Sequence, residues 1–278
     1  MNTPSPTRFC YFGTPGVAAQ TLTGLIEHGM APALVITAPD APRGRGLALT
    51  PSETRVVAES YDIHVLTPEM LDEAAIATIS AYHCTYAVVV AYGKIFPQAL
   101  IDTFPRGAIN VHYSLLPKYR GATPMEAALL AGDTETGVTV QQMALELDAG
   151  DVLAKTITPI APEETARELR PRLIHLGTSL LVETLPRFER GEILPLAQET
   201  VGATRARKFK KEDGQLDLSA PAMENWRKYR AYADTIGTYF FKDDTRYKIT
   251  KASLRDGRFI IERVIPEGRR ETHWPANR

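Results

Sequence analysis

Cysteine is scarce in this chain, which has 2 cysteines in 278 residues, Cys10 and Cys84. Neither belongs to a spacing typical of metal ligands, and so few thiols favour a reducing cytoplasm. Long apolar runs are also lacking, because no stretch reaches the roughly 18 residues that a membrane helix needs. Residues 1–7 lack the basic and apolar parts of a signal peptide. We therefore expect a cytoplasmic globular protein that does not enter a membrane.

The net charge of −1 conceals an uneven distribution. Residues 203–278 contain 18 Lys and Arg against 11 Asp and Glu, an excess of +7, whereas residues 1–202 carry −8. A basic end on an acidic body suggests a polyanionic partner. An idle, solvated basic surface is the alternative, since such a modest excess is common.

The first half of the chain alternates short apolar runs with helical stripes. Repeated β–α–β units at this spacing predict an α/β fold with a doubly wound, mainly parallel sheet. Its length leaves room for one large domain or for a large and a small one. The expected strands are 8–12, 33–37, 63–66, 86–91, 107–111, 137–143 and 152–157, and the expected helices are 17–26, 54–61, 70–81 and 124–130.

The strand expected at 107–111 carries two polar residues, Asn110 and His112. Because they are two positions apart, their side chains leave the same side of a strand. The carboxyl end of such a strand is where open α/β sheets bind ligands. A lone histidine there is more often hydrogen-bonded scaffolding than a catalyst, so these two residues alone do not decide the role.

A second element, Leu-Asp-Ala-Gly-Asp at 147–151, changes that balance. Asn-x-His-x-Ser-Leu-Leu-Pro at 110–117 followed by Asp-x-Gly at 148–150 resembles the formyltransferase family that uses 10-formyltetrahydrofolate. The resemblance runs from about residue 9 to about residue 204. It implies a Rossmann-like catalytic domain at 1–204 and catalytic roles for Asn110, His112 and Asp148.

The chemistry of these three groups suits formyl transfer to an amine. That reaction needs a neutral nucleophile, a stabilised oxyanion and a proton acceptor. Asn110 offers a neutral amide donor, and His112 can donate to the oxyanion or carry the proton of the amine. Asp148, if it lies near His112, would orient the ring and favour its protonated form. Which of His112 and Asp148 takes the proton stays open, and no metal is needed.

The same resemblance implies the folate site. Residues 91–97 are similar to the family's Ala-Tyr-Gly-x-Ile-Leu-Pro, a loop that lines the folate pocket, and a glycine there allows close backbone approach to a flat heterocycle. An ordinary strand-to-helix turn is the alternative. The residues expected to bind the folate are Tyr92, Gly93, Ser114, Leu115, Leu116 and Pro117.

Residues 39–46, Pro-Asp-Ala-Pro-Arg-Gly-Arg-Gly, are too polar and too rich in Gly and Pro for a core. They resemble a segment typical of family members that act on methionyl-tRNA, as does Gly-Thr-Pro at 13–15, although Ala41 replaces the usual arginine. Arg43 and Arg45 suit phosphate contacts and stacking on unpaired bases. We expect a loop that binds tRNA, whereas the residues alone favour a surface loop.

Residues 205–278 are expected to form a small, basic, β-rich C-terminal domain. A basic run occupies 205–211, and its Lys208, Lys210 and Lys211 are expected to contact tRNA. Strands are predicted at 238–242, 246–254 and 258–264, joined by turns at Asp243-Asp244 and Asp256-Gly257. Family members that act on tRNA usually carry a longer barrel here, so closure of a barrel is left open.

Taken together, the resemblance implies transfer of the formyl group of 10-formyltetrahydrofolate to the amino group of initiator methionyl-tRNA, for translation initiation. We expect a monomeric enzyme without a metal. Two alternatives remain. A sugar-nucleotide N-formyltransferase would share Asn110, His112 and Asp148 but generally lacks the Gly-Arg-Gly loop. A non-catalytic RNA-binding protein on the same scaffold would not need the three residues.

Overall fold

The computed structural model describes residues 8–43 and 47–275. The chain packs into two compact units. The N-terminal unit comprises Met1–Pro117, Val138–Thr156 and Leu173–Gly202. The C-terminal unit comprises Lys118–Gly137, Ile157–Arg172 and Ala203–Arg278.

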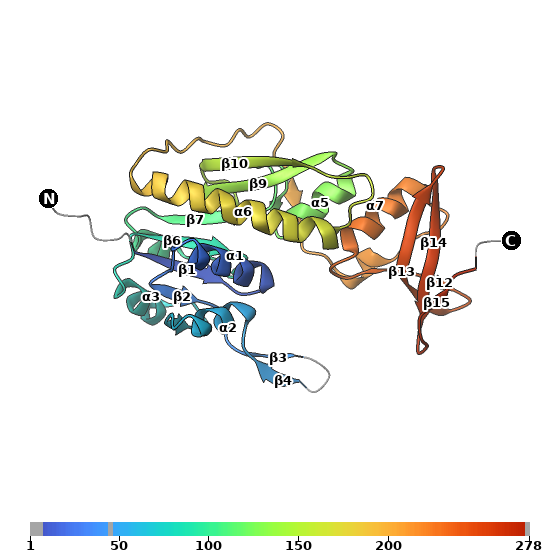
Figure 1. The fold of residues 1–278 in the computed structure, drawn as a ribbon, viewed down its shortest axis with the longest axis horizontal. Coiled ribbons are helices and arrows are strands. Elements are labelled where there is room, and N and C mark those ends of the chain that lie inside the picture. The colour runs from blue at the N-terminus through green and yellow to red at the C-terminus, as the bar shows by residue number, and fades with distance from the viewer. Residues whose placement is uncertain (1–7, 44–46, 276–278) are drawn as a thin grey trace. The chain divides into compact units, whose positions relative to one another are not determined.

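The described part of the N-terminal unit is built on a seven-stranded sheet with the order β10-β9-β7-β6-β1-β2-β5 (Figure 1). The strands from β7 to β5 are parallel, and β9 is antiparallel to β7. This order confirms the predicted doubly wound, mainly parallel sheet. The strands are β1 (Phe9–Gly13), β2 (Leu34–Ile36), β5 (Val65–Leu66), β6 (Tyr86–Val90), β7 (Ala108–His112), β9 (Glu135–Gln142) and β10 (Val152–Pro159). The helices are α1 (Gly16–Glu27), α2 (Glu53–Ser60), α3 (Glu73–Ser80), α4 (Gln98–Asp102) and α6 (Ala166–Glu189). One end each of β9, β10 and α6 falls in the segments of the C-terminal unit.

Both faces of this sheet are covered by helices, which is why β1 and β6 are apolar along their whole length. On one face, Phe12 and Val89 pack in a core with Ile79 of α3 and Leu100 of α4. Successive residues of a strand point to opposite faces of the sheet. The neighbours of Phe12 and Val89 along β1 and β6 therefore face the other side, where other helices bury them.

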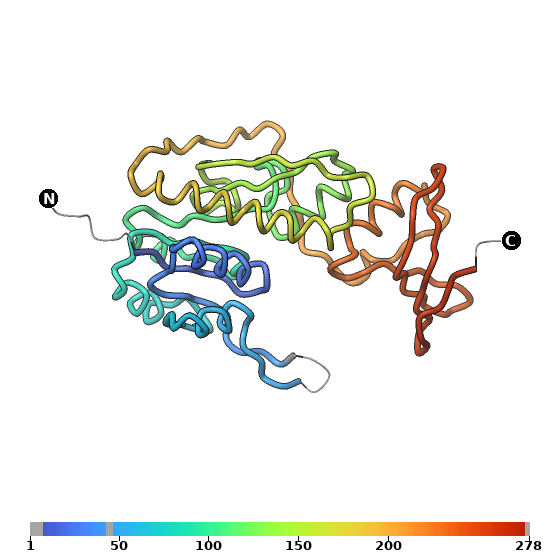
Figure 2. The backbone as a smooth tube through the Cα atoms, viewed as in Figure 1, coloured from blue at the N-terminus to red at the C-terminus, as the bar shows by residue number. Residues whose placement is uncertain are grey.

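The opposite face is covered by α1 and α6. The hydroxyl of Tyr11 donates a 2.7 Å hydrogen bond to the carbonyl of Ala18 in α1. The hydroxyl of Tyr86 donates to Glu189 of α6 at 2.6 Å, and its ring packs edge-on against Phe188. After α6 the chain returns along β10, as the trace in Figure 2 shows, and a β-bridge joins Val152 to Leu196.

The C-terminal unit contains an antiparallel sheet with the order β12-β13-β14-β15, packed against α7. Its core is formed by Leu216, Phe240, Ile249, Ile261 and Val264, and partly buried aromatic side chains pack around them. The elements are α5 (Pro124–Ala131), α7 (Ala222–Tyr232), β12 (Thr238–Lys242), β13 (Thr245–Arg255), β14 (Arg258–Pro266) and β15 (Thr272–His273), with β8 (Arg120–Gly121) paired to β11 (Arg205–Ala206).

Both predicted hairpin turns are present. Asp243 and Asp244 have φ of 48° and 57°, and Asp256 and Gly257 have φ of 48° and 71°. Two successive positive φ values match the twist of a tight hairpin, and Asp and Gly tolerate them best. Among the described residues the sheet stays open, since β12 and β15 are its two ends. Within the described residues, this sheet therefore does not close into a barrel.

The longest described helix is the 24-residue α6. Its sequence includes several Arg and Glu residues, and within residues 8–43 and 47–275 no helix combines the length and apolarity needed to cross a membrane.

Candidate active site

Asn110 and His112 lie at the end of β7 and face the same side of the sheet, as their spacing predicted. Both meet a single carboxylate, that of Asp148. The amide Nδ2 of Asn110 lies 3.4 Å from Asp148 Oδ1, and His112 Nδ1 lies 3.6 Å from Asp148 Oδ2. The structure therefore brings together the three residues that the two motifs singled out, although Asn110 and Asp148 are 38 positions apart in sequence.

Burial strengthens the contacts of Asp148 with Asn110 and His112. The side chain of His112 is 5% exposed and that of Asp148 is 11% exposed, so water competes little for the carboxylate. Charged and polar groups interact more strongly where solvent is excluded. An amide donor, an imidazole and a carboxylate that converge in such a place can bind a carbonyl oxygen and move a proton.

Asp148 lies in the turn between β9 and β10 with a left-handed backbone, at φ of 53°. Asp tolerates this conformation better than most residues do, and such outliers concentrate at functional sites. Gly150 is needed for the same turn to pack against β9. A Cβ atom at position 150 would lie 1.9 Å from the carbonyl oxygen of Gln142. The Asp-x-Gly pattern thus has a steric reason.

The loop of residues 114–117 follows β7 directly and is held by β9 and β10. Thr139, which lies opposite His112 in the β7–β9 pair, accepts a hydrogen bond from the amide of Leu116 at 3.1 Å and donates to the carbonyl of Ser114 at 2.7 Å. Lys155 Nζ donates to the carbonyl of Leu116. Desolvation lowers the pKa of this lysine, and the carboxylate of Glu199 opposes that shift.

These contacts orient the predicted folate-binding loop. Ser114 and Leu116 are buried, Leu115 and Pro117 are half-buried, and the Leu116–Pro117 peptide is cis. No motif in the sequence singled out Thr139, whose hydroxyl holds this loop. The pattern that could have indicated it is a polar residue between the buried Val138 and Val140. Thr139 lies two positions from Gln141, so both side chains leave the same face of the strand.

Tyr92 and Gly93, the other predicted folate contacts, follow β6. Gly93 is exposed with φ of 82°, and Ala91 has the unusual φ of 46° for a residue with a side chain. Tyr92 packs its ring edge-on against Phe12 in the core, and burial raises the pKa of its hydroxyl to about 12. Ile95 is 93% exposed. The segment therefore presents backbone and one apolar side chain rather than the tyrosine ring.

The predicted tRNA-binding arginine loop is described in part. Residue 43 ends β3 (Ala41–Arg43), which pairs with β4 (Ala48–Thr50), whereas Arg45 lies outside the described residues. We therefore place only the backbone of Arg43, at the end of a two-stranded hairpin.

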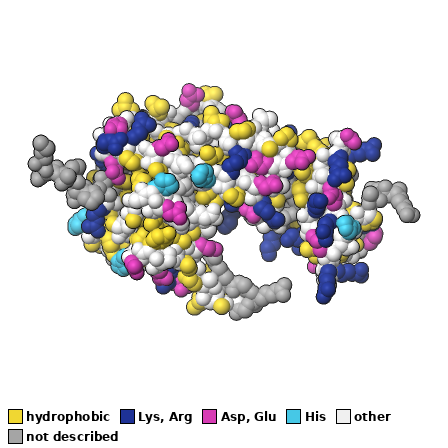
Figure 3. Space-filling view, viewed as in Figure 1, with side chains coloured by type: hydrophobic (Ala, Val, Ile, Leu, Met, Phe, Trp, Pro, Cys, Tyr) yellow, Lys and Arg dark blue, Asp and Glu magenta, His cyan; other side chains and the backbone are white. Residues whose placement is uncertain are grey.

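The basic run of the C-terminal unit is exposed at Lys208, Lys210 and Lys211. Figure 3 shows dark blue Lys and Arg side chains on several parts of the visible face of this unit. Arg207 differs from its neighbours because its guanidinium binds Asp213 through two hydrogen bonds of 2.7 and 2.6 Å. This contact holds the pKa of Asp213 at about 2. Arg207 thus fixes the run against Asp213, and the exposed Lys208, Lys210 and Lys211 add accessible positive charge.

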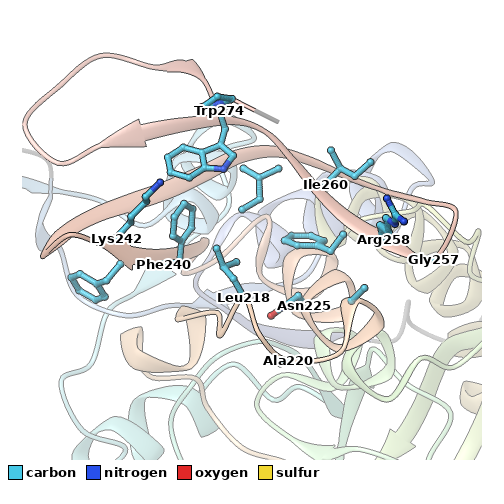
Figure 4. A pocket seen from close by; sticks show the side chains of 14 residues that line it. Leu218, Ala220, Asn225, Phe240, Lys242, Gly257, Arg258, Ile260 and Trp274 are labelled. Atoms are coloured by element: carbon cyan, nitrogen blue, oxygen red, sulfur yellow. The ribbon is translucent and has the colours of Figure 1, made fainter. Parts of the chain in front are cut away.

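The C-terminal unit also contains a cavity of about 630 Å³ (Figure 4). Its wall includes Phe240 and Trp274, and the exposed Lys242 and Arg258 flank it. The ammonium of Lys242 lies 5.4 Å from the centroid of the Trp274 ring. None of the residues predicted for the active site lines this cavity. No local sequence pattern indicates this cavity, because only packing brings these strands and the segment before α7 together.

No group of three or more His, Cys, Asp or Glu side chains that could hold a metal ion occurs in the part of the chain that the structure describes.

Two family models match the chain. The family model for formyl transferase matches residues 8–185, and the model for the formyl transferase C-terminal domain matches residues 208–267. The methionyl-tRNA formyltransferase of Citrifermentans bemidjiense is 40% identical over 263 residues, which are 94% of this chain and 83% of that protein.

Solved structures show the same fold. A sugar N-formyltransferase from Shewanella sp. superposes with a TM-score of 0.69 at 17% identity, covering 93% of this chain and 99% of that one. A methionyl-tRNA formyltransferase from Clostridium thermocellum gives 0.62 at 14% identity, covering 96% and 100%. Identities this low establish the fold alone, so the structural neighbours do not choose between the acceptors.

Proposed function

Since this chain belongs to the formyl transferase family, we propose that it transfers the formyl group of 10-formyltetrahydrofolate to the free amino group of initiator methionyl-tRNA. The observation that carries this proposal is the convergence of Asn110, His112 and Asp148 at the end of β7. The acceptor is inferred from three relatives that are 40–41% identical over 92–94% of the chain, each named a methionyl-tRNA formyltransferase.

In this proposal Asn110 donates its amide hydrogen to the formyl oxygen as that oxygen gains negative charge. A preorganised donor of this kind acts most strongly where charge develops. His112 acts through Nε2 as donor or proton carrier in this proposal, while its Nδ1 lies 3.6 Å from Asp148 Oδ2. The distance of 3.6 Å is too long for a hydrogen bond, and catalytic contacts often shorten when substrate binds.

The folate brings the one-carbon unit, and the protein positions it. Ser114, Leu115, Leu116 and Pro117 are proposed to hold it from one side, with the backbone of Tyr92 and Gly93 on another. Two observations support the fit. The loop at 114–117 is anchored by Thr139 and Lys155, and the positive φ of Gly93 opens the backbone beside the exposed Ile95.

Binding of the tRNA is proposed to use Arg43 and Arg45 at one place and Lys208, Lys210 and Lys211 at another. Exposed cations without a base-reading geometry position a phosphate backbone and do not read sequence. We therefore assign the exposed Lys208, Lys210 and Lys211 to affinity and not to recognition of the initiator.

One assay separates this function from its alternatives. Purified protein is incubated with 10-formyltetrahydrofolate and either charged initiator tRNA or an amino-sugar nucleotide, and formylated product is counted. The proposal expects product from the tRNA only. Product from the sugar nucleotide would identify a sugar N-formyltransferase, and tRNA binding without turnover on either acceptor would identify a non-catalytic RNA-binding protein.

A further inference from the structure

Gln141 of β9 lies directly opposite Asn110 of β7 in the antiparallel pair. Directly opposed residues of such a pair project from the same face, with Cβ atoms about 5 Å apart. The Nε2 atom of Gln141 donates to Asp148 Oδ1 at 3.1 Å, the same oxygen that Asn110 Nδ2 approaches at 3.4 Å. Two amides from neighbouring strands thus hold one carboxylate oxygen.

Gln198 determines which end of the Gln141 amide faces Asp148. Its Nε2 donates to Gln141 Oε1 at 3.0 Å. With its oxygen engaged by this donor, Gln141 must turn its NH₂ group toward the carboxylate. Gln198 Nε2 also lies 2.9 Å from the carbonyl of Asp148 and 2.7 Å from that of Gly150, so it binds the backbone of the catalytic turn as well.

The burial of Gln141 makes its contacts consequential. Gln141 is 1% exposed, so its amide has little access to water if Asp148 or Gln198 moves away. A buried polar group that loses its partner bears the full cost of desolvation. The buried Gln141 amide therefore favours the position in which it binds Asp148 Oδ1. In that position Oδ2 of Asp148 lies on the side of His112.

We propose that Gln141 is a positioning residue for Asp148 and that Gln198 sets the orientation of the Gln141 amide. Through this pair the carboxylate is presented to His112 by one oxygen while the other is held away. The proposal deepens the proposed function and rests on it, because the effect on catalysis depends on Asp148 and His112 acting together. Neither glutamine touches the formyl group in this account.

The first test replaces Gln141 with methionine, which keeps the length of the side chain and removes the donor. We expect kcat to fall by about ten- to a hundredfold, the usual effect of misplacing a catalytic group, with KM for both substrates nearly unchanged. The matched control is Gln142→Leu, one residue along β9 with its side chain on the opposite face, which should keep wild-type kcat. Full kcat in Gln141→Met would overturn the proposal.

The second test uses Gln141→Glu, which is isosteric but places a second carboxylate against Asp148. When the new carboxyl is ionised it repels Asp148, and when it is protonated its O–H can donate to Asp148 as the amide did. The ratio of wild-type to variant kcat should therefore shrink as the pH is lowered. A purely structural role for Gln141 predicts a ratio that does not depend on pH, and that result would reject the proposal.

The role of Gln198 is tested by a double-mutant cycle. Gln198→Leu should lower kcat more in the wild-type background than in the Gln141→Met background, where only its contacts with the backbone of the Asp148 turn remain to be lost. Independent, additive effects would show that Gln198 does not act through Gln141.

A crystal structure of Gln141→Met separates this proposal from the proposed function, because it needs no substrate. Asp148 should turn away from His112 Nδ1 in the variant, and an unchanged carboxylate would overturn the positioning role even if methionyl-tRNA is formylated. Conversely, a displaced carboxylate in a protein that does not formylate methionyl-tRNA would uphold the positioning role and reject the acceptor.

Discussion

Thr139 lies directly opposite His112 across the antiparallel pair of β7 and β9, and its hydroxyl bridges two backbone groups of the loop that follows His112. One side chain therefore connects the strand that carries the histidine to the loop proposed to hold the folate. The same strand carries Gln141 two residues further on, opposite Asn110. The row of polar groups on β7 is matched by a supporting row on β9.

The first prediction concerns this bridge. Thr139→Val keeps the shape of the side chain and leaves the amide of Leu116 and the carbonyl of Ser114 without their partner. We expect the free energy of unfolding to fall by about 1–3 kcal/mol, the cost of orphaned buried polar groups, and KM for the folate to rise. Urea denaturation and steady-state kinetics measure the two effects. Thr156→Val on β10 is the control, and equal losses in both variants would contradict the assignment.

The second prediction concerns the catalytic pair on β7. His112→Ala or Asn110→Ala should lower kcat by about a hundredfold or more, because each removes a group that acts on developing charge or on a proton. The fold should survive, as circular dichroism would verify. His175→Ala, an exposed histidine of α6, should leave turnover unchanged. Near-full turnover by His112→Ala on a substrate used by the wild type would refute the roles assigned here.

The third prediction concerns the loop at residues 39–46. Arg45→Ala should raise KM for charged tRNA much more than the dissociation constant for the folate, since an arginine on a glycine-rich loop contacts phosphate or stacks on a base. Fluorescence titration with folate and kinetics with tRNA provide the comparison. Arg190→Ala, which removes an exposed arginine elsewhere in the N-terminal unit, is the control. An equal loss with a short methionine-bearing mimic would assign the loop to the active site in general.

The fourth prediction concerns the basic run. Phosphate contacts release counterions, so tRNA affinity should fall steeply with salt in proportion to the number of contacts. Reversing the charge of Lys208, Lys210 and Lys211 should flatten that slope, whereas folate binding should not change. The control reverses Lys242, Lys248 and Lys251 on the strands of the same unit. A slope that is unchanged by the first set would remove the run from the tRNA-binding surface.

The fifth prediction concerns the pH dependence of Asp213. Its folded pKa of about 2 lies below the ordinary carboxyl value because Arg207, and then the amide of Lys210, bind its charged form. A depressed folded pKa contributes stability above the unfolded pKa, at about pH 4, and loses it as the pH falls toward 2. The stability difference between wild type and Asp213→Asn should therefore be constant above about pH 4 and shrink below it. A difference that persists at pH 2 would contradict the pairing.

Much of the fold was predictable from local patterns. The fully apolar runs of β1 and β6 indicated strands buried on both faces, and Asp243-Asp244 and Asp256-Gly257 predicted hairpin turns because few residues accept positive φ. Whether the C-terminal sheet closes into a barrel was not predictable in this way. It depends on whether distant strands find a partner, which no local preference states.

The sequence by itself determined that Asn110 and His112 share one face of a strand, since a period of two follows from backbone geometry within a few residues. Asp148 was indicated only by the resemblance of the two motifs to the formyltransferase family, because an isolated Asp-x-Gly is usually a turn. Only the tertiary structure decided which other side chains serve that carboxylate. Gln141 reaches Asp148 because β9 pairs antiparallel with β7 in one register, and Gln198 does so because the chain after α6 returns along β10. These contacts join segments up to 57 residues apart, and their register is set by packing of the whole sheet, which short-range sequence preferences do not encode.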